Sequence, residues 1–546
     1  MVTTLPDDIL HLLCEELALR QDFHTLFQCA CASRALAVPA LTYLYRTQHY
    51  SPIRGGTDDE SLPRAVRELI VQKWSILWRS IIASSLDATL FPYCRYLKML
   101  DFRDLENLLE DDQFRGKIPK HFFSEPLMIF HKTIDHPLRR SGRRKVERLN
   151  VPAIIDAIGE VITQHTPTLE SISGKLLSHA LVRWAPRVPR LQALELKDGS
   201  PLEDDLVHSS IHAHCPQFNS LSIYTWAADN RDHRLSEFIN GMRPQSLRFF
   251  QTIRDVGASQ ETFLALENHC ESLKDLRLCL SNEALEQLSS LQTCTALETL
   301  RIEDTSGRVD LEKTQNDVFL EVITWLRNCK TLRNLTMTKF LSAAAVTMPL
   351  LLETNIKLRR LEVDSYVVKD HQLFHQALAH QASSLEILSL SGDTDEMVRD
   401  DVDILVDVLK SLIELRELKL LLPEVLRDEH YVWILDSLLH LEELYITGLL
   451  LSDIVLVSLA KLTNLRSVTF NGLSTFTKEG LSQWVSKLGP GNRGIRIMID
   501  MADPYSLLSD EQVALVRSEL EAKVDGSLEY TPFRDPDMSE FEGESD

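Results

Sequence analysis

Leucines recur along most of this chain in a six-position pattern, L-x-x-L-x-L, that returns every 22 to 35 residues. The clearest copies lie at 191–196, 273–278, 297–302, 332–337, 358–363, 385–390, 415–420, 441–446 and 465–470, and weaker copies lie at 97–102, 169–174 and 218–223. In each copy apolar residues alternate with a polar one, which predicts a strand with its apolar side chains on one face. One such strand cannot bury that face alone, so the repeat predicts stacked units with a continuous core.

The segments between these strands show helical spacing of apolar residues. In 316–329 we expect Val318, Val322, Ile323 and Leu326 to form one buried stripe. Similar segments lie at 403–412, 428–439 and 452–462. After the strand at 273–278, Asn282 is the expected helix cap. This strand-and-helix period is the leucine-rich repeat signature, and it predicts an α/β solenoid with parallel strands on a concave face and helices on a convex face.

The first 50 residues lack the repeat and predict three short amphipathic helices, at 5–17, 22–36 and 40–46. Pro6 and two aspartates fall in the first turn of the first helix, where proline and acidic residues are favourable. A core this small is marginal by itself, so the module is expected to need a partner or a fused neighbour.

These residues resemble an F-box. The matching positions are Leu5, Pro6, Asp8, Ile9 and Leu10, then Leu26, Cys29 and Cys31, then Ser33 and Arg34, and finally Leu44, Tyr45 and Arg46. Where many members of the family carry a tryptophan after the Ser-Arg position, this chain has Ala35-Leu36. With the repeats that follow, the chain resembles the F-box/leucine-rich-repeat family.

The resemblance implies that the chain docks a Skp-family adaptor within an SCF-type cullin-RING ubiquitin ligase. The implied adaptor contacts are Leu5, Pro6, Ile9, Leu10, Leu13 and Leu26. The same residues could form the module's own core, and both roles are compatible in so small a unit. The repeat arc would then bind the substrate protein, with the chain as one copy in the complex.

The substrate surface is expected at the polar positions that alternate with the repeat leucines. These positions are Glu195, Lys197, Tyr224, Asp275, Arg277, Arg301, Glu303, Arg360, Glu362, Asp364, Glu417, Lys419, Glu443 and Tyr445. Their mixed signs argue against a large polyanion as the target. The alternative is that most of them are ordinary solvated strand positions, since binding energy concentrates in a few residues.

The expected domain order is a module at 1–50, a helical linker at 60–95, and a repeat domain at 96–525 followed by an acidic, disordered tail at 532–546. A strand at 495–500 and a capping helix at about 509–524 are expected to close the repeats.

An insertion at about 104–150 interrupts the first repeats. It carries a basic cluster made of Arg139, Arg140, Arg143, Arg144, Lys145 and Arg148. This cluster suits phosphate recognition, nuclear targeting or simple neutralisation of nearby acidic surface.

The formal net charge of −22 argues against a general nucleic-acid binder and favours partners with basic patches. Nine cysteines without a CxxC pair suggest reduced thiols in the cytoplasm or nucleus. Cys215, Cys270, Cys294 and Cys329 each lie three residues before a repeat, where other repeats have leucine, so a buried packing role is expected. No signal peptide is evident, and the apolar stretch at 446–462 is too short and polar to span a bilayer.

The catalytic signatures GxSxG, GxxxxGK[ST] and HExxH are missing from the sequence, so we expect no enzyme activity and no cofactor. The segment HSSIHAHC at 208–215 offers a metal site as an alternative to packing. The sequence therefore favours a non-catalytic substrate receptor of a ubiquitin ligase. A repeat scaffold or inhibitor that binds a partner without ubiquitin transfer is the alternative, because one fold serves both roles.

Overall fold

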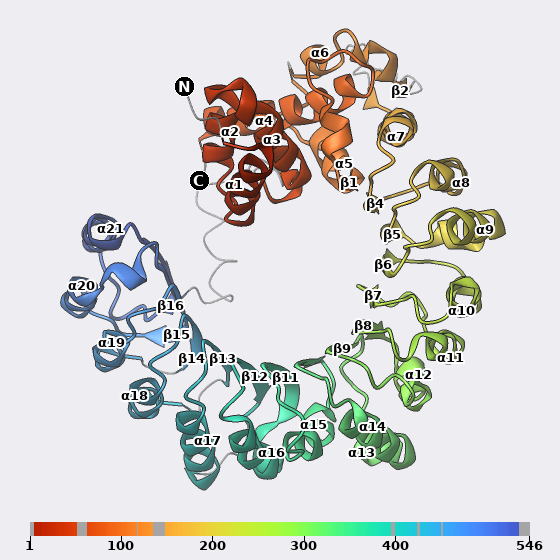
Figure 1. Cartoon of the computed structure of the whole chain (residues 1–546). Helices are drawn as coiled ribbons and strands as arrows, with labels where there is room; N and C mark the ends of the chain where they lie inside the picture. The colour runs from red at the N-terminus through yellow and green to blue at the C-terminus, as the bar shows by residue number, and fades with distance from the viewer. Residues whose placement is uncertain are drawn as a thin grey trace, which may run out of the picture. The chain divides into compact units, whose positions relative to one another are not determined.

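The computed structural model describes residues 5–51, 63–116, 118–134, 148–394, 399–422, 426–448 and 451–533. The chain divides into two compact units, Met1–Val256 and Gly257–Asp546, which we call unit one and unit two. In both units strands alternate with helices, and the repeat strands run parallel (Figure 1). This is the α/β solenoid that the repeat spacing predicts, preceded by a three-helix module.

The N-terminal module of unit one consists of α1 (Asp7–Leu19), α2 (Phe23–Ala32) and α3 (Arg34–Arg46). Side-chain caps fix the N-termini of α2 and α3. The Asp22 carboxylate accepts a hydrogen bond from the Thr25 amide at 3.0 Å, and the Ser33 hydroxyl accepts one from the Leu36 amide at 3.2 Å. The core of the module is small and consists of Cys14, Ala18, Leu26, Ala40 and Tyr43.

Helix α4 (Arg64–Ser84) joins this module to the first repeat strand. The Tyr45 hydroxyl of α3 lies 2.7 Å from the Ser80 hydroxyl of α4. On the other side of α4, the indole N–H groups of Trp74 and Trp78 both donate to one carboxylate oxygen of Asp104, at 2.8 and 2.6 Å. All three side chains are buried, so one acidic residue holds two turns of α4 against α5 (Phe102–Glu110).

The repeat strands of unit one pair in parallel in chain order. They are β1 (Met99–Asp101), β4 (Ser171–Gly174), β5 (Ala193–Asp198), β6 (Ser220–Thr225) and β7 (Phe249–Thr252). The helices between them are α5, α7 (Val151–His165), α8 (Ser178–Trp184), α9 (Asp205–His214) and α10 (Arg231–Gly241). The expected insertion contributes α5, α6 (Ile118–Phe122) and a small antiparallel pair, β2 (Thr133–Ile134) with β3 (Arg148–Leu149).

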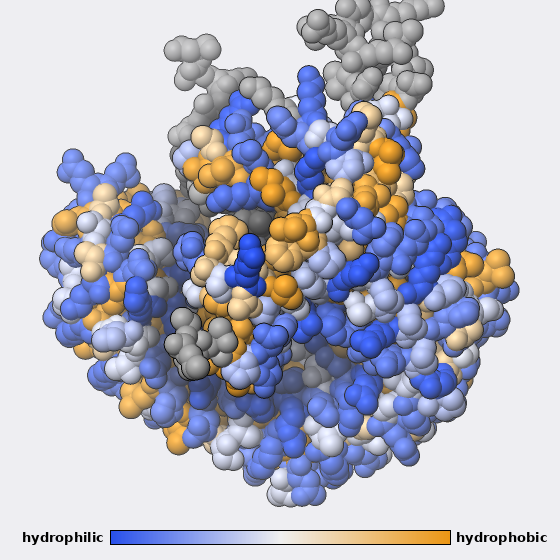
Figure 2. All heavy atoms as spheres, turned by 45° about the horizontal axis from the view of Figure 1, so that its top comes forward, coloured by the Kyte–Doolittle hydropathy of each residue, from blue (hydrophilic) through white to orange (hydrophobic). Residues whose placement is uncertain are grey.

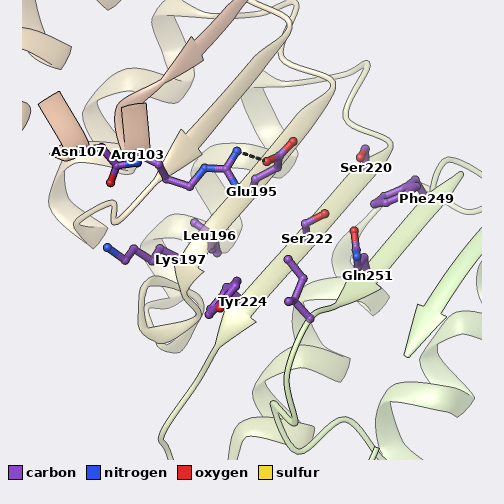
Figure 3. A pocket seen from close by; sticks show the side chains of 11 residues that line it. Arg103, Asn107, Glu195, Leu196, Lys197, Ser220, Ser222, Tyr224, Phe249 and Gln251 are labelled. Atoms are coloured by element: carbon purple, nitrogen blue, oxygen red, sulfur yellow. Dashed lines mark hydrogen bonds and ion pairs between the residues drawn. The ribbon is translucent and has the colours of Figure 1, made fainter. Parts of the chain in front are cut away.

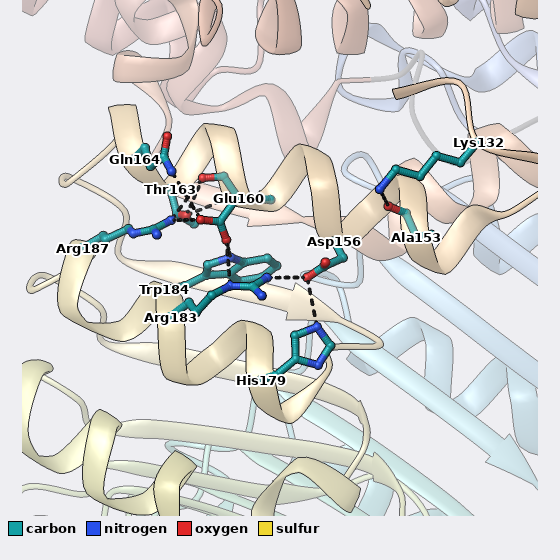
Figure 4. A network of polar contacts seen from close by, with 11 residues as sticks. Lys132, Ala153, Asp156, Glu160, Thr163, Gln164, His179, Arg183, Trp184 and Arg187 are labelled. Carbon is teal, nitrogen blue, oxygen red and sulfur yellow. Dashed lines mark hydrogen bonds and ion pairs between the residues drawn. The ribbon is translucent and has the colours of Figure 1, made fainter. Parts of the chain in front are cut away.

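A polar network fastens α8 to α7 on the helical side of unit one (Figure 4). The Glu160 carboxylate contacts the guanidinium groups of Arg183 at 3.0 Å and Arg187 at 2.7 Å, and it accepts a hydrogen bond from the Trp184 indole at 3.2 Å. Burial opposes ionisation of Glu160, but these hydrogen bonds and charges outweigh it and lower the pKa of the carboxyl. This network joins the helices of neighbouring repeats, and it cannot be predicted from the leucine pattern.

Unit two continues the same alternation. Its strands are β8 (Asp275–Leu280), β9 (Thr299–Asp304), β10 (Asn334–Thr338), β11 (Arg360–Val367), β12 (Ile387–Asp393), β13 (Glu417–Leu421), β14 (Glu443–Thr447), β15 (Ser467–Ser474), β16 (Arg496–Ala502) and β17 (Ser527–Pro532). Its helices are α11 (Gln260–Leu266), α12 (Asn282–Leu285), α13 (Leu311–Thr314), α14 (Asn316–Asn328), α15 (Ala343–Leu351), α16 (Gln372–Leu378), α17 (Arg399–Ser411), α18 (Asp428–Ser437), α19 (Asp453–Leu459), α20 (Lys478–Lys487) and α21 (Asp510–Val524). Within this unit the strands line the inner side of the curve and the helices the outer side (Figure 1).

The register explains why the leucine motif repeats. Leu276, Leu300 and Leu335 are direct neighbours in adjacent strands, and each is fully buried. Each such side chain contributes about 1.5–3 kcal/mol when it leaves water, so a row of them forms one continuous core. The polar residues between them, such as Arg277 and Arg301, form the opposite surface of the strands, which we call the strand face.

The cysteine positions before the repeats are mostly buried. Cys215, Cys294 and Cys329 are inaccessible or nearly so, and burial raises the pKa of each thiol to about 12. Cys270 is half-buried. These thiols pack as small apolar groups between repeats.

Several local expectations differ from the structure. The cap after β8 is Ser281, whose hydroxyl accepts from the Ala284 amide, and Asn282 already lies inside α12. In α14 the buried stripe is Phe319, Val322, Trp325 and Leu326, while Val318 and Ile323 are only half-buried. The Trp325 indole donates to the Cys294 carbonyl at 3.0 Å, so Trp325 belongs to the buried face of the helix. Beyond the expected end of the repeats, β17 adds a further parallel strand to β16.

Among the helices described, none is long and apolar enough to cross a membrane.

Candidate protein-binding surfaces

The N-terminal module exposes many apolar side chains for its size. Leu5, Ile9 and Leu13 are 58%, 41% and 48% exposed, and Pro6 is also exposed. Leu10 and Leu26, by contrast, are 6% and 0% exposed and lie inside the module. Four of the six expected adaptor contacts are therefore at the surface, and Leu10 and Leu26 have a core role.

Further exposed apolar residues enlarge this surface. They are Leu12 and Leu19 on α1, Phe27 on α2 and Val38 on α3. We call the exposed residues Leu5, Pro6, Ile9, Leu12, Leu13, Leu19, Phe27 and Val38 the module surface. In the space-filling view, apolar residues gather in the upper centre of the molecule, whereas hydrophilic residues dominate its lower part (Figure 2). For Leu12 and Leu19, the sequence signal was an excess of leucine in α1 beyond one helical stripe.

A hollow of about 570 Å³ lies on the strand face of unit one (Figure 3). Arg103 and Asn107 come from α5, and the remaining walls come from β5, β6, β7 and the residue after β7. The lining residues are Arg103, Asn107, Glu195, Leu196, Lys197, Ser220, Ser222, Tyr224, Phe249, Gln251 and Ile253. This hollow brings together three expected site residues, Glu195, Lys197 and Tyr224, and its volume is in the range of ligand and side-chain pockets.

The charges around this hollow are paired. The Arg103 guanidinium contacts Asp101 at 3.2 Å and Glu195 at 2.7 Å. The Lys197 ammonium contacts Glu106 at 2.9 Å. Because its charges are neutralised and its walls carry hydroxyl groups and an aromatic ring, this hollow is suited to bind a protein surface that presents both polar and apolar groups. Of the partners from α5, Glu106 falls within the insertion and Arg103 directly precedes it; no repeat pattern covers either residue, so sequence reasoning missed them.

The strand face of unit two carries the other expected site residues in register. Asp275 pairs with Arg277 at 2.8 Å on β8, and Arg301 pairs with Glu303 at 3.5 Å on β9. Glu303 also contacts Lys339 at 3.0 Å, next to β10. Asp364 accepts a hydrogen bond from the Lys339 amide. The first strands of this face are therefore internally neutralised.

The middle of this face is different. Arg360 on β11 contacts Glu362 at 2.8 Å and reaches Glu417 on β13 at 3.4 Å. Lys419 places its ammonium 5.1 Å from the centre of the Tyr445 ring, a cation–π contact between β13 and β14. Glu443 is exposed and forms no ion pair with any described residue. The structure thus brings Arg360, Glu362, Glu417, Lys419, Glu443 and Tyr445 together on three strands, β11, β13 and β14.

The histidine-rich segment at 208–215 has packing contacts of its own. The His208 ring donates to the Leu202 carbonyl at 2.7 Å, and the His212 ring lies 5.0 Å from the Phe238 ring centre. Burial, with the charge of His208, lowers the pKa of His212 to about 4. In the described part of the chain, no three His, Cys, Asp or Glu side chains gather in a way that could hold a metal ion.

The basic cluster lies almost entirely outside the described residues. Arg139, Arg140, Arg143, Arg144 and Lys145 belong to the stretch 135–147, and only Arg148, in β3, is described. Of the expected acidic tail, residues 534–546 also lie outside the described ranges.

No family model and no curated protein matches this chain. Among solved structures, it is similar to the yeast complex of Rad7 and Elc1, with 13% identity, a TM-score of 0.39, and coverage of 65% of this chain and 82% of that one. It is also similar to a protein from Bacteroides fragilis, with 14% identity, a TM-score of 0.24, and coverage of 52% of this chain and 65% of that one. At these scores and identities neither likeness assigns the chain to a family.

Proposed function

We propose that the chain is the substrate-recognition subunit of an SCF-type cullin-RING ubiquitin ligase. The observation that carries the proposal is the position of the F-box-like residues. Leu5, Pro6, Ile9 and Leu13 are exposed on a folded three-helix module, where a monomeric protein would normally bury them. The module surface is therefore the expected docking site for a Skp-family adaptor, and the strand faces of the repeats are the expected substrate sites.

In this role the chain acts by positioning, and it supplies no nucleophile, acid or base. A substrate held on the strand faces stays close to the ubiquitin-charged enzyme of the assembled ligase. Tethering raises the effective concentration of substrate lysines without any new chemistry on this chain. The expected location is the cytoplasm, the nucleus or both, with a protein as the substrate and no cofactor.

Co-purification with a Skp-family adaptor tests the proposal. The informative variant is Leu5→Ala/Ile9→Ala/Leu13→Ala, because all three side chains are exposed and their loss leaves the module core intact. The matched control is Leu206→Ala/Leu320→Ala/Leu373→Ala, which removes three exposed leucines from repeat helices. Capture by the wild type and the control, with loss in the first variant, supports the ligase role.

If the folded wild type does not capture the adaptor, the proposed role in a ubiquitin ligase is refuted. The same strand faces would then belong to a scaffold or inhibitor that binds its partner without ubiquitin transfer. Equal loss in both triple variants would also contradict the proposal, since it would mean that exposed leucines anywhere on the chain support nonspecific capture.

A further inference from the structure

The net charge of this chain is confined to one of its two units. Residues 1–256 contain 31 acidic and 31 basic residues, so unit one is formally neutral. Residues 257–546 contain 49 acidic and 27 basic residues, which accounts for the whole net charge of −22. Half of that excess falls between residues 351 and 450, where 20 acidic residues face 9 basic ones. This segment includes β11 to β14, the middle of the strand face in unit two.

Two carboxylates face each other at this place. Glu417 on β13 and Glu443 on β14 are direct neighbours in the parallel register. Adjacent strands lie about 4.8 Å apart, so the two side chains leave the sheet side by side. Like charges in directly opposite positions are destabilising, so these two carboxylates repel each other in the free protein.

The chain's own cations relieve this repulsion only in part. Arg360 divides its guanidinium between Glu362 and Glu417, at 2.8 and 3.4 Å. Lys419 directs its ammonium to the Tyr445 ring. Burial raises the pKa of Glu417, and the neighbouring Glu443 and Glu362 raise it further; Arg360 and Lys419 lower it, and the net result is upward. Glu443 remains without an ion pair among the described residues.

Small polar side chains lie next to the pair in the register. Ser467 follows Glu443 in the same row, and Ser389 and Thr469 flank Lys419 and Tyr445 in the next row. Tyr445 stands beside the pair in a fixed orientation, because its hydroxyl accepts a hydrogen bond from the Asn471 amide at 2.7 Å. An aromatic ring next to two carboxylates suits an arginine or lysine side chain.

We propose that the strand face of β11 to β14 binds an extended, lysine- or arginine-rich segment of a partner protein, with one cationic side chain placed between Glu417 and Glu443. Charge complementarity selects this occupant. A cation converts the repulsion between the two carboxylates into attraction, and the excess negative charge of unit two accelerates the encounter. In the ligase proposed above, this segment belongs to the substrate, and to that extent the inference rests on the proposed function.

Fluorescence anisotropy with the full chain tests this surface. The probe is a fluorescein-labelled peptide of alternating Arg, Ser, Lys and Ser residues, and the comparison peptide replaces each Arg and Lys with Glu. The variant is Glu417→Gln/Glu443→Gln, which removes both charges and keeps the side-chain shapes. The control is Asp407→Asn/Glu429→Gln, which removes the same charge from exposed positions on α17 and α18.

We expect the wild type to bind the basic peptide but not the acidic one, with affinity falling as salt rises. Loss of both charges at the pair weakens binding by about tenfold or more, whereas the control changes it by less than about threefold. The Tm of the Glu417→Gln/Glu443→Gln variant stays equal to that of the wild type or rises, because a repulsion has been removed. A lowered Tm would instead indicate a structural role for the pair.

Equal weakening in both double variants would overturn the proposal, since it would reduce the effect to net charge. Absence of binding to the wild type at physiological salt would also overturn it. Adaptor capture is measured on the same preparations. If the adaptor is captured but the basic peptide is not bound, this inference alone fails; if the peptide binds but the adaptor is not captured, the ligase role alone fails.

Discussion

Replacement of Asp104 by alanine should loosen the packing of α4 against α5. One carboxylate oxygen of Asp104 accepts hydrogen bonds from the Trp74 and Trp78 indoles, at 2.8 and 2.6 Å, and both indoles are fully buried. Without it, two buried N–H donors lose their acceptor. Hydrogen bonds to charged groups contribute about 1.5–3 kcal/mol each, so the local cost is roughly 3–6 kcal/mol as an upper range.

Asp104→Asn provides a graded comparison. Its carbonyl oxygen can occupy the place of the oxygen that both indoles contact, so the geometry survives while the negative charge is lost. Since charge-assisted hydrogen bonds are about twice as strong as neutral ones, we expect roughly half the effect of the alanine change. Asp112→Ala is the matched control, because the Asp112 side chain is 87% exposed.

Hydrogen exchange of the α4 amides, followed by mass spectrometry, measures this effect locally. It is preferable to a global unfolding experiment, since a chain of two units need not unfold in one step. The expected order of protection at residues 64–84 is wild type and Asp112→Ala, then Asp104→Asn, then Asp104→Ala. Unchanged protection in Asp104→Ala would refute the reasoning, because it would show that packing alone holds the helix.

Three other changes test separate parts of the structure. In Gly159→Ala, the new Cβ would lie 2.4 Å from the Trp184 ring, so we expect a loss of about 1–3 kcal/mol and a lower Tm, whereas Gly489→Ala, with no atom within 4 Å, should be neutral. Burial lowers the pKa of His375 to about 4, so the unfolded chain takes up this proton first as pH falls below about 6.5. Stability should therefore decline between pH 6.5 and 4, by roughly 1–3 kcal/mol from this group, and His375→Gln should flatten that part of the Tm-against-pH curve. Leu26→Ala removes a fully buried core side chain and should cost about 2–5 kcal/mol. It should abolish exchange protection in α1 to α3 together with adaptor capture; protection that survives would contradict the core role.

The strands and their order were predictable because the same leucine motif recurs in each repeat and packs against the same apolar core. Leu276, Leu300 and Leu335 recur at strand spacing, and each repeat buries the same side of its strand against its neighbour. The cysteines before the repeats follow the same logic, since Cys294 and Cys329 replace leucine where the environment is apolar. The three helices of the N-terminal module were also predictable from their apolar spacing, but the boundary between the last two was wrong: the expected helix at 22–36 ends at Ala32, and Ser33 caps a new helix that begins at Arg34.

The candidate surfaces were only partly predictable. Sequence spacing identified Glu417 and Glu443 as strand-face residues, but only the parallel register made them direct neighbours. Leu10 and Leu26 share the apolar character of Leu5 and Leu13, and only packing separates core from surface.

By itself, the sequence determined the period of the solenoid, the face of each strand that is buried, and the helical nature of the first 50 residues. The tertiary structure decided which charges meet, as when Arg103 on α5 reaches Glu195 on β5. It also decided that Asp104 holds Trp74 and Trp78, and that β17 extends the sheet beyond the last leucine motif. The physical reason is range: periodicity and capping act within a few residues, whereas hydrogen bonds and ion pairs join positions that only folding brings together.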